Sequence, residues 1–347
     1  MNATAPSASP TLPPLTGGHP PLRGAVRARP EDFRVDEVPA YLPEGSGDHL
    51  YVHFEKTGLD TKEAVRRIAR ALDVDPREAG FAGMKDRHAV TRQWASFLFG
   101  DAARLEGADL DGVVVLEASR HRNKLRTGHL AANRFDLFVR GASAEQATEA
   151  SARLETLARR GVPAYYGEQR FGRDGANLEA ARRWLVEGGR APRDRFQKKL
   201  LVSTLQAAIF NELCAERVRE GTLDGAIEGD LMRKEESGGL FVSEALEVDR
   251  ERAARFEISA TGPMIGAKMR WPEAEARARE EAALARWKLG PEDLERFRAS
   301  GEGTRRPYRV PLTDARLEVE PEGVRLLFSL PSGAYATIVL AELVSPL

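Results

Sequence analysis

The chain has 347 residues, of which 42% are hydrophobic and 30% are charged, and its formal net charge is −1. This length exceeds the roughly 250–300 residues at which a single hydrophobic core stops growing, so it predicts two domains. A single cysteine, Cys214, excludes an internal disulfide framework and a cysteine-rich zinc site. No stretch reaches the roughly 18–20 apolar residues that a membrane span requires.

The first 22 residues contain six prolines and almost no charge. This composition is typical of a disordered tail. The segment also lacks the basic start and apolar middle of a secretory signal. We therefore expect a disordered, proline-rich tail at residues 1–22 and a cytoplasmic protein.

Apolar and polar residues alternate at 33–38 and again in HLYVHFEK (49–56), which predicts two half-buried strands. Thr61 is the predicted N-cap of a helix that runs through KEAVRRIARAL. Further strands are predicted at 113–119 and 133–141, followed by a helix at 144–160.

Helix-forming residues dominate the next part of the chain, and helices are predicted at 177–188, 196–219, 273–287 and 291–299. Strands return at ARLEVE and VRLLFSL, and a last helix is predicted at ATIVLAELV. A strand-rich, then helix-rich, then strand-rich order predicts an α+β domain interrupted by a mostly helical one.

The stretch FAGMKDRHAVTRQWASF (81–97) places one carboxylate, Asp86, among Lys85, Arg87 and His88. A carboxylate that stays ionised and poorly solvated can act as a covalent nucleophile. Cationic neighbours favour its charged form. Local spacing alone favours a simpler interpretation, a loop aspartate that caps a turn.

Other site chemistries find less support. A glycoside hydrolase would need a second carboxylate, for which Glu168 and Asp174 are candidates, but no spacing places either near Asp86. The six histidines show no HExxH pairing, and neither a GxxxxGK[ST] loop nor a GxGxxG motif is present. The sequence therefore predicts no metal and no nucleotide cofactor.

Residues 118–135 contain no acidic residue, although Arg120, Arg122, Lys124, Arg126 and Arg134 are present, and a second basic concentration lies at 182–199. A polyanion binds such segments through phosphate contacts and counterion release. A solvated loop balanced by acidic neighbours fits equally well.

Several aromatic residues lie beside Arg, Asn or Gly, as the residues that stack on RNA bases do. They are Phe33, Phe135, Tyr165, Tyr166, Phe171 and Tyr335. A single aromatic residue is more often part of a core.

The segment FAGMKDRHAVTRQW resembles the catalytic segment of the TruD family of tRNA pseudouridine synthases. Four further segments resemble family signatures in the family's order, and the resemblance covers nearly the whole chain after the tail. They are PEDFRVDE (30–37), SRHRNKLRTGHLAANRF (119–135), VPAYYGEQRFGRDGANLEAARRWL (162–185) and LPSGAYATIVLAEL (330–343). The order of the motifs is more specific than any one of them.

The resemblance implies an α+β, pseudouridine-synthase-type mixed-sheet domain at 23–162 and 312–347. It places a largely helical second domain, the TRUD domain, as an insert at 163–311. The implied activity is the isomerisation of a uridine of tRNA, uridine 13 of the D-arm, to pseudouridine without a cofactor. Asp86 matches the family's catalytic aspartate. The remaining alternatives are an RNA-binding protein without catalysis and a metal-dependent nuclease that uses Asp86 and Glu168.

The resemblance also carries over substrate contacts. The predicted substrate-binding residues are Phe33, Asn133, Phe135, Tyr335 and Lys85, and the predicted RNA-binding residues are Arg120, Arg122, Lys124 and Arg126. Tyr335 stands where the family generally has Phe, so it is only a weak candidate for the group that removes the C5 proton. Ala341 stands where an arginine is common, which puts one contact in doubt, and the position of Met84 varies in the family.

Overall fold

The structure is a computed structural model that describes residues 12–300 and 302–345, and the chain divides into two compact units. Of the described residues, the sheet unit comprises His19–Glu155, Leu312–Ala336 and 343–345. The helical unit comprises 12–18, Thr156–Pro311 and Thr337–Glu342. This division differs from the predicted domain limits mainly at residues 156–162 and 337–342.

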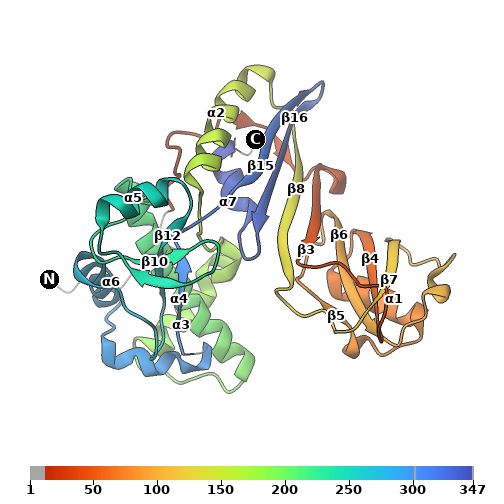
Figure 1. Ribbon diagram of the computed structural model, residues 1–347, viewed down its shortest axis with the longest axis horizontal. Coiled ribbons are helices and arrows are strands. Elements are labelled where there is room, and N and C mark those ends of the chain that lie inside the picture. The colour runs from red at the N-terminus through yellow and green to blue at the C-terminus, as the bar shows by residue number, and fades with distance from the viewer. Residues whose placement is uncertain (1–11, 301, 346–347) are drawn as a thin grey trace. The chain divides into compact units, whose positions relative to one another are not determined.

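The sheet unit is built on one mixed, nine-stranded sheet (Figure 1). Its main order is β15 (Thr313–Glu320), β16 (Gly323–Pro331), β8 (Leu130–Arg140), β3 (Phe33–Pro39), β6 (Val90–Leu98), β4 (His49–Thr57) and β7 (Val113–His121). Two short strands, β2 (Ala25–Val26) and β5 (Gly80–Phe81), pair with β8 and β6. The β3–β6 pair is parallel, and the other neighbours in this sheet are antiparallel.

The parallel pair decides which segments meet. Val35 of β3 lies opposite Thr91 of β6, so the chain enters both strands from the same end of the sheet. Strand β4 is antiparallel to β6 and places Lys56 opposite Thr91 at that same end. The residues that precede β3, the residues that precede β6 and the end of β4 therefore converge.

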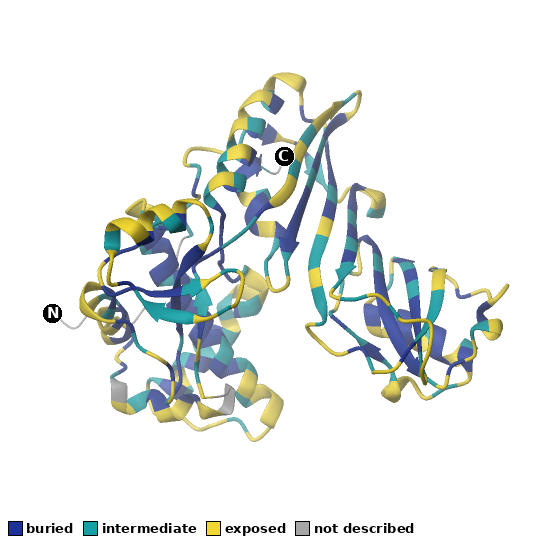
Figure 2. Ribbon diagram, viewed as in Figure 1, coloured by how far each residue is buried: buried dark blue, intermediate teal, exposed yellow. Residues whose placement is uncertain are grey.

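Helix α1 (Thr61–Leu72) covers one face of the sheet beside β4 and β6. Its buried residues are spaced three or four apart, at Ala64, Val65, Ile68, Ala69 and Leu72, as an amphipathic helix requires. They pack against buried residues of β4 and β6, seen as dark blue in Figure 2. The N-cap is not Thr61 as predicted, because the Asp60 carboxylate accepts the Glu63 N–H and leaves the Thr61 hydroxyl for another contact.

The terminal segments also differ from prediction. Within the predicted disordered tail, residues 1–11 lie outside the described residues. The backbone N–H groups of Leu15 and Thr16, however, donate to the Glu342 carboxylate, and β1 (Leu22–Arg23) pairs with β17 (Val344–Ser345). The later part of the predicted tail is therefore ordered by contacts with the end of the chain.

The other helices of the sheet unit are short or cross into the helical unit. Helix α2 (Ala144–Arg160) and helix α7 (Ala336–Leu343) each contain residues of both units. Single-turn helices η1 (Pro30–Asp32), η2 (Pro76–Glu78) and η3 (Ala102–Leu105) lie between strands.

The helical unit contains a small sheet that the sequence did not predict. Strands β11 (Leu240–Val242), β10 (Leu231–Lys234), β12 (Ile258–Met264) and β13 (Thr304–Pro307) pair in that order. A separate pair joins β9 (Val162–Pro163) and β14 (Arg309–Val310). The helices are α3 (Ala176–Leu185), α4 (Arg195–Arg219), α5 (Leu246–Ala254), α6 (Ala274–Arg286), η4 (Glu168–Phe171), η5 (Arg173–Gly175) and η6 (Pro291–Ser300).

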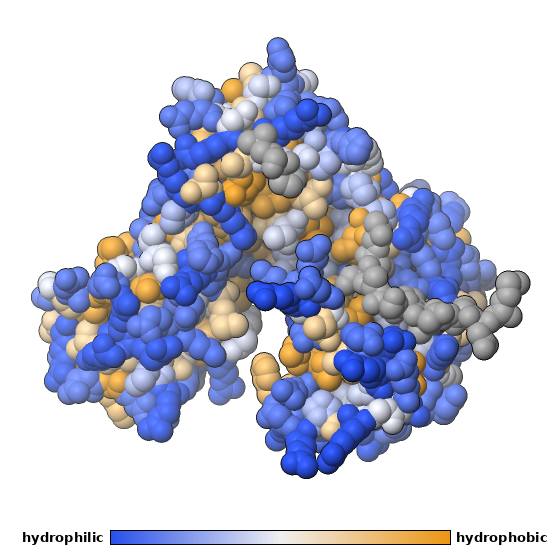
Figure 3. All heavy atoms as spheres, turned by 180° about the vertical axis from the view of Figure 1, so that it is seen from behind, coloured by the Kyte–Doolittle hydropathy of each residue, from blue (hydrophilic) through white to orange (hydrophobic). Residues whose placement is uncertain are grey.

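The 25-residue helix α4 is the centre of the helical unit, because most of its residues from Leu201 to Arg217 are buried. Two buried ion pairs of this unit are Arg305 with Glu280 and Arg217 with Asp230. None of the helices within the described ranges is both long enough and apolar enough to span a bilayer. Hydrophilic residues cover most of the surface seen from behind (Figure 3).

Candidate functional site

Asp86 lies in the loop between β5 and β6, at the end of the sheet where β3 and β6 begin. Its side chain is 30% exposed, so the carboxylate is partly withdrawn from water but can be reached. The Oδ1 atom accepts the backbone N–H of His88 at 3.0 Å. This local bond fixes the direction of the carboxylate.

Arg27, which precedes β3, is the cation that contacts this carboxylate. Its Nη1 lies 3.1 Å from Asp86 Oδ2. Its Cζ lies 4.0 Å from the ring centroid of Phe33, so the guanidinium joins the ring and the carboxylate. Arg27 has a φ of 68°, in the left-handed region that is unfavourable for residues other than glycine. Such strain is retained where surrounding contacts hold the residue in place.

Lys56 approaches the same loop from β4. Its side chain is completely buried, and Nζ donates to the Asp86 backbone oxygen at 2.7 Å. Burial lowers the pKa of Lys56 to about 8, against the opposing influence of Asp86 and Asp60. A second cation thus lies beside Asp86 and holds its main chain.

The cations adjacent to Asp86 in sequence have other partners. Lys85 Nζ lies 2.5 Å from Glu37 Oε2, and the Lys85 side chain is only 7% exposed. Arg87 Nε donates to the Gly58 carbonyl at 3.2 Å. The expectation that Lys85 and Arg87 surround the carboxylate is therefore wrong, because neighbours along an extended chain point in different directions. A substrate contact for Lys85 stays a prediction.

The loop that carries Asp86 is anchored to α1 and β6. The Thr61 hydroxyl accepts the Lys85 N–H at 2.8 Å and donates to Gln93 Oε1 at 3.0 Å. Gln93 Nε2 in turn donates to the Gly83 carbonyl at 3.3 Å. Thr61 and Gln93 are fully or almost fully buried, so these bonds are shielded from water.

The predicted aromatic residues Phe33 and Phe135 come together on the face of the sheet that carries Lys56. Their ring centroids lie 6.3 Å apart at 79°, and Phe135 stacks on Phe328 of β16 at 5.3 Å. Phe33 is 3% exposed and Phe135 7%. The two rings therefore form the floor of the site, and Arg27 lies over Phe33.

Asn133 of β8 lies opposite Glu37 of β3 and shares the face of Phe135, two residues further along β8. Its Oδ1 atom is buried and accepts no hydrogen bond from any described residue. Such an atom needs an explanation, and a donor on a ligand is one. Tyr335 lies half-buried in the turn between β16 and α7, and its contact with substrate stays a prediction.

Of the predicted RNA-binding residues, Arg120 lies in β7, and Arg122, Lys124 and Arg126 lie in the loop between β7 and β8. Arg120 Nη2 donates to the Gly100 carbonyl at 2.8 Å, Arg122 pairs with Glu44 at 3.1 Å, and Lys124 lies 4.0 Å from Glu78. Arg126 is exposed and forms no ion pair with the residues that the structure describes. Acidic neighbours in space thus offset part of the positive charge of this loop. Its contacts with RNA stay a prediction.

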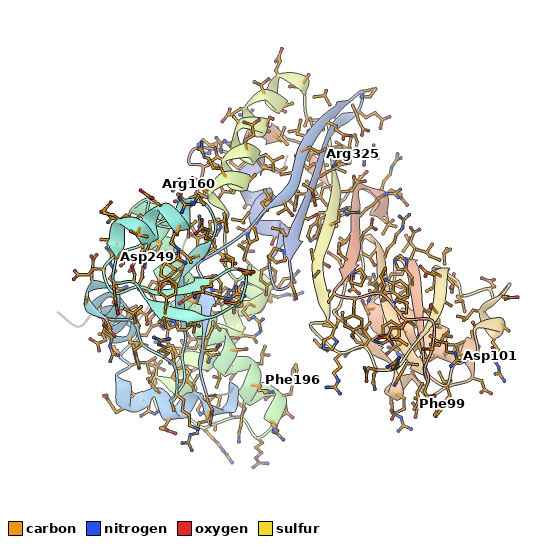
Figure 4. The ribbon with its side chains drawn as sticks, in the orientation of Figure 1. Phe99, Asp101, Arg160, Phe196, Asp249 and Arg325 are labelled. Carbon is orange, nitrogen blue, oxygen red and sulfur yellow. The ribbon has the colours of Figure 1, made fainter. Side chains whose placement is uncertain are left out.

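The opposite face of the sheet carries charges that neutralise each other. Arg325 of β16, labelled in Figure 4, lies 2.6 Å from Asp136, and Arg140 lies 2.7 Å from Asp32. These pairs line a hollow of about 570 Å³. We do not assign this hollow to the site, because its residues alternate along β8 with Phe135 and therefore face away from Lys56.

The turn-capping interpretation of Asp86 agrees with its bond to the His88 N–H, which does not conflict with a catalytic role. A nuclease would need a metal site, and a glycoside hydrolase would need a second carboxylate beside Asp86. Within residues 12–300 and 302–345, no three His, Cys, Asp or Glu side chains group closely enough to hold a metal ion. Glu168 lies in η4 and Asp174 in η5, both in the helical unit.

The site thus combines an anchored, partly exposed carboxylate, two cations from distant segments, and a floor of aromatic rings. A carboxylate held in this way can attack an electrophilic carbon. Arg27 and Lys56 were not among the predicted site residues. Arg27 is one of several arginines in its part of the sequence, and Lys56 looks like an ordinary strand residue. Only the strand register could identify them as neighbours of Asp86.

Comparison with known proteins places the chain among relatives of one kind. The family model described as tRNA pseudouridine synthase D (TruD) matches residues 14–190 and 194–343. A protein named tRNA pseudouridine synthase D from Anaeromyxobacter sp. (strain Fw109-5) is 46% identical over 336 residues, 95% of each chain. One of the same name from Thermus thermophilus is 45% identical, over 94% of this chain and 90% of the relative.

A solved structure from Methanosarcina mazei carries the same family description. It matches with a TM-score of 0.73 at 23% identity and covers 97% of this chain and 95% of that chain. This likeness confirms the predicted α+β fold class.

Proposed function

We propose, on the premise that this chain belongs to the tRNA pseudouridine synthase D (TruD) family, that its target is uridine 13 of the D-arm and that Asp86 is the nucleophile. Family membership makes the chain a tRNA pseudouridine synthase, an isomerase that converts a uridine of tRNA to pseudouridine. The observation that supports Asp86 is its partly exposed carboxylate, which lies 3.1 Å from Arg27 Nη1. The Arg27 guanidinium in turn lies over the Phe33 ring.

The reaction is balanced within the substrate. The bond between ribose C1′ and uracil N1 breaks, the base turns, and a bond forms between C1′ and C5. The proton lost from C5 is matched by the proton gained at N1, so no redox partner or group donor is consumed. In the first half of this sequence Asp86 acts in one of two ways. It attacks C1′ as N1 leaves, and C5 then displaces the carboxylate from C1′, or it removes the C2′ proton to give a glycal-type intermediate and returns that proton as C1′ bonds to C5.

The residues around Asp86 are suited to a base taken out of its stack. A flipped base is commonly held against aromatic or guanidinium planes. Here Arg27 covers Phe33, so the base meets the Arg27 guanidinium, with Phe33 and Phe135 beneath it. The buried Asn133 Oδ1 is placed to accept a hydrogen bond from the nucleotide. Tyr335 and Lys85 complete the proposed substrate contacts.

The rest of the tRNA is held through its phosphates. We assign this role on the sheet unit to Arg120, Arg122, Lys124 and Arg126, which give affinity and orientation but not chemistry. Because tRNA is the substrate, the proposed location is the cytoplasm. No cofactor is proposed, since the isomerisation is balanced without one.

The test is to incubate the protein with an unmodified tRNA transcript and map pseudouridine by position. We expect product at position 13 and none in a transcript whose uridine 13 is replaced by cytidine. Asp86→Asn should reduce conversion by at least about a thousandfold while tRNA binding persists, because the amide is not a nucleophile. A matched control is Asp36→Asn, which changes a β3 carboxylate paired with Arg92.

The outcomes separate the alternatives. Product in the Asp86→Asn variant would remove Asp86 from the proposal. Product at another uridine would overturn the position but keep the family activity. Tight tRNA binding without product in the wild-type protein would favour a binding protein, and cleavage abolished by a chelator would favour a nuclease.

A further inference from the structure

A second group of cations lies in the helical unit, where the chain leaves α3 and begins α4. We call it the α4 basic cluster, and it consists of Arg190, Arg193, Arg195, Lys198, Lys199 and the aromatic Phe196. All of these side chains are exposed except that of Lys198, which is half-buried. Arg190 and Arg193 precede α4, and the other members lie in its first five residues, so the cluster occupies one short stretch of the chain.

The cations of this cluster have no acidic partners among the residues that the structure describes. The neighbouring carboxylates are committed elsewhere, since Glu187 accepts from Arg182 at 2.6 Å and Asp194 accepts the Gln197 N–H at 2.7 Å as the N-cap of α4. Many other arginines of the same unit are paired, as in Arg160 with Asp224 and Arg305 with Glu280. The five cations of the cluster thus surround one carboxylate, Asp194, and a net positive charge remains.

Phe196 adds an apolar surface to the cluster. Its side chain is 73% exposed, the highest value among the exposed large apolar residues of the described chain. Figure 4 labels this side chain at the start of α4. The buried face of α4 begins only at Leu201, so Phe196 is not part of the core. An exposed ring bordered by cations suits a partner that is anionic and offers flat faces.

We infer that the α4 basic cluster binds the phosphate backbone of the tRNA substrate and that Phe196 stacks on one of its unpaired bases. This inference rests on the proposed function only in taking tRNA as the ligand. Arginine forks bind phosphate oxygens bidentately, and three of the five cations are arginines. A membrane-binding helix would instead need a broad apolar face, whereas Phe196 is followed by Gln197, Lys198 and Lys199.

The charge component is tested with the triple variant Arg193→Gln/Lys198→Gln/Lys199→Gln. Equilibrium binding of an unmodified tRNA transcript is measured over a range of salt concentrations. Each lost phosphate contact reduces the slope of log K against log salt by about 0.7–0.9, so we expect a reduction of about 2–3.

The matched control removes the same charge from paired arginines. Arg250, Arg255 and Arg298 each pair with a glutamate of the same unit. Their combined change to glutamine should leave the salt slope unaltered. A triple variant of the cluster that behaves like this control would overturn the assignment.

The stacking component is tested separately. Phe196→Ala should weaken tRNA binding by roughly fivefold to 150-fold without changing the salt slope, because stacking releases no counterions. Phe196→Trp should restore affinity, and Phe196→Leu should not. A fully paired RNA duplex should not distinguish Phe196→Ala from wild type. An equal loss on the duplex would show that Phe196 acts through folding instead of stacking.

A parallel arm uses vesicles that contain phosphatidylserine. Vesicle binding that the triple variant loses, together with an unchanged tRNA salt slope, would assign the cluster to a membrane surface and overturn the inference. A different measurement tests the proposed function, because pseudouridine formed by the Asp86→Asn variant would contradict the role of Asp86. Because the cluster is measured by binding, its result does not depend on that outcome.

Discussion

Lys56 shows how one side chain can couple protonation to the geometry of the site. A lysine buried in this way loses hydration, which disfavours its charged form. The groups that face it are Asp86 and Asp60, which favour the charge, and Lys85, which opposes it. Thr91, opposite Lys56 on β6, has a buried hydroxyl without a partner among the described residues. The Lys56 ammonium group does not bond to this hydroxyl but donates to the Asp86 backbone oxygen at 2.7 Å.

This arrangement predicts an alkaline limit to activity. Burial lowers the pKa of Lys56 to about 8, so the ammonium group beside Asp86 is charged below this pH and neutral above it. We expect kcat to fall as the pH rises through about 8. Lys56→Met should lower kcat by about tenfold to a hundredfold at pH 7, the cost of a hydrogen bond from a charged group, and should abolish the alkaline decline. Single-turnover rates between pH 6 and 9 measure both effects.

The stability of the protein checks the same ionisation independently. The unfolded chain keeps the Lys56 proton up to the ordinary pKa of 10.5, whereas the folded chain loses it near 8. The unfolded state therefore binds more protons in this interval, and the contribution of Lys56 to the free energy of unfolding rises with pH between about 8 and 10.5. Lys56→Met should lack this rise. Identical pH profiles for wild type and Lys56→Met, in rate and in stability, would contradict the assignment.

At the scale of elements, helix α1 both covers the sheet and holds the loop that carries Asp86. Thr61→Val removes the hydroxyl that accepts the Lys85 N–H and donates to Gln93. Leaving buried polar groups unpaired costs about 1–3 kcal/mol, and the loop loses an anchor. We expect a lower free energy of unfolding together with a lower kcat, measured by urea denaturation and single-turnover kinetics.

The control for this prediction is Ile68→Val on the same helix. Ile68 is fully buried against the sheet, and the change costs about 0.5–1.5 kcal/mol without touching the loop. Ile68→Val should therefore lower stability and leave kcat unchanged. If the two variants lowered kcat equally, Thr61 would act only through the stability of α1.

Elements with a clear period could be predicted from the sequence. The strands at 33–38 and 49–56 and the helix after Asp60 alternate or repeat as their structures require, and they occur where expected. The small sheet of the helical unit could not be predicted in this way. Strands β10, β11 and β13 have three or four residues each, too few to show alternation, and their pairing joins segments as distant as β12 and β13.

Some residues of the candidate site could be predicted from the sequence, and others could not. Asp86 was predicted from its motif, and Phe33 and Phe135, predicted beside it, contact each other on one face of the sheet. The cations that hold Asp86 could not be predicted, because the segment itself offers Lys85 and Arg87 as nearer candidates. Only the parallel β3–β6 pair and the antiparallel β4 bring Arg27 and Lys56 to the loop. The family resemblance of the segment led to the proposal of Asp86, and strand register decided which cations lie beside it.

At the scale of the whole molecule, each unit carries an exposed cationic surface. In the sheet unit this surface includes Arg126 of the loop between β7 and β8, and in the helical unit it is the α4 basic cluster. If one tRNA contacts both, the two sets of phosphate contacts belong to one binding event. Contributions from residues without shared partners add in free energy.

Adding Arg126→Gln to the triple variant of the α4 basic cluster tests this directly. Arg126→Gln alone should reduce the salt slope by about 0.7–0.9, and the combined variant by about 3–4, close to the sum of the separate changes. A titration should give one tRNA per chain in every case. Two tRNA molecules per wild-type chain, with each variant altering only one binding phase, would contradict a shared substrate. The two units would then have to be treated as independent RNA-binding surfaces, because counterion release adds only for contacts that form on the same RNA.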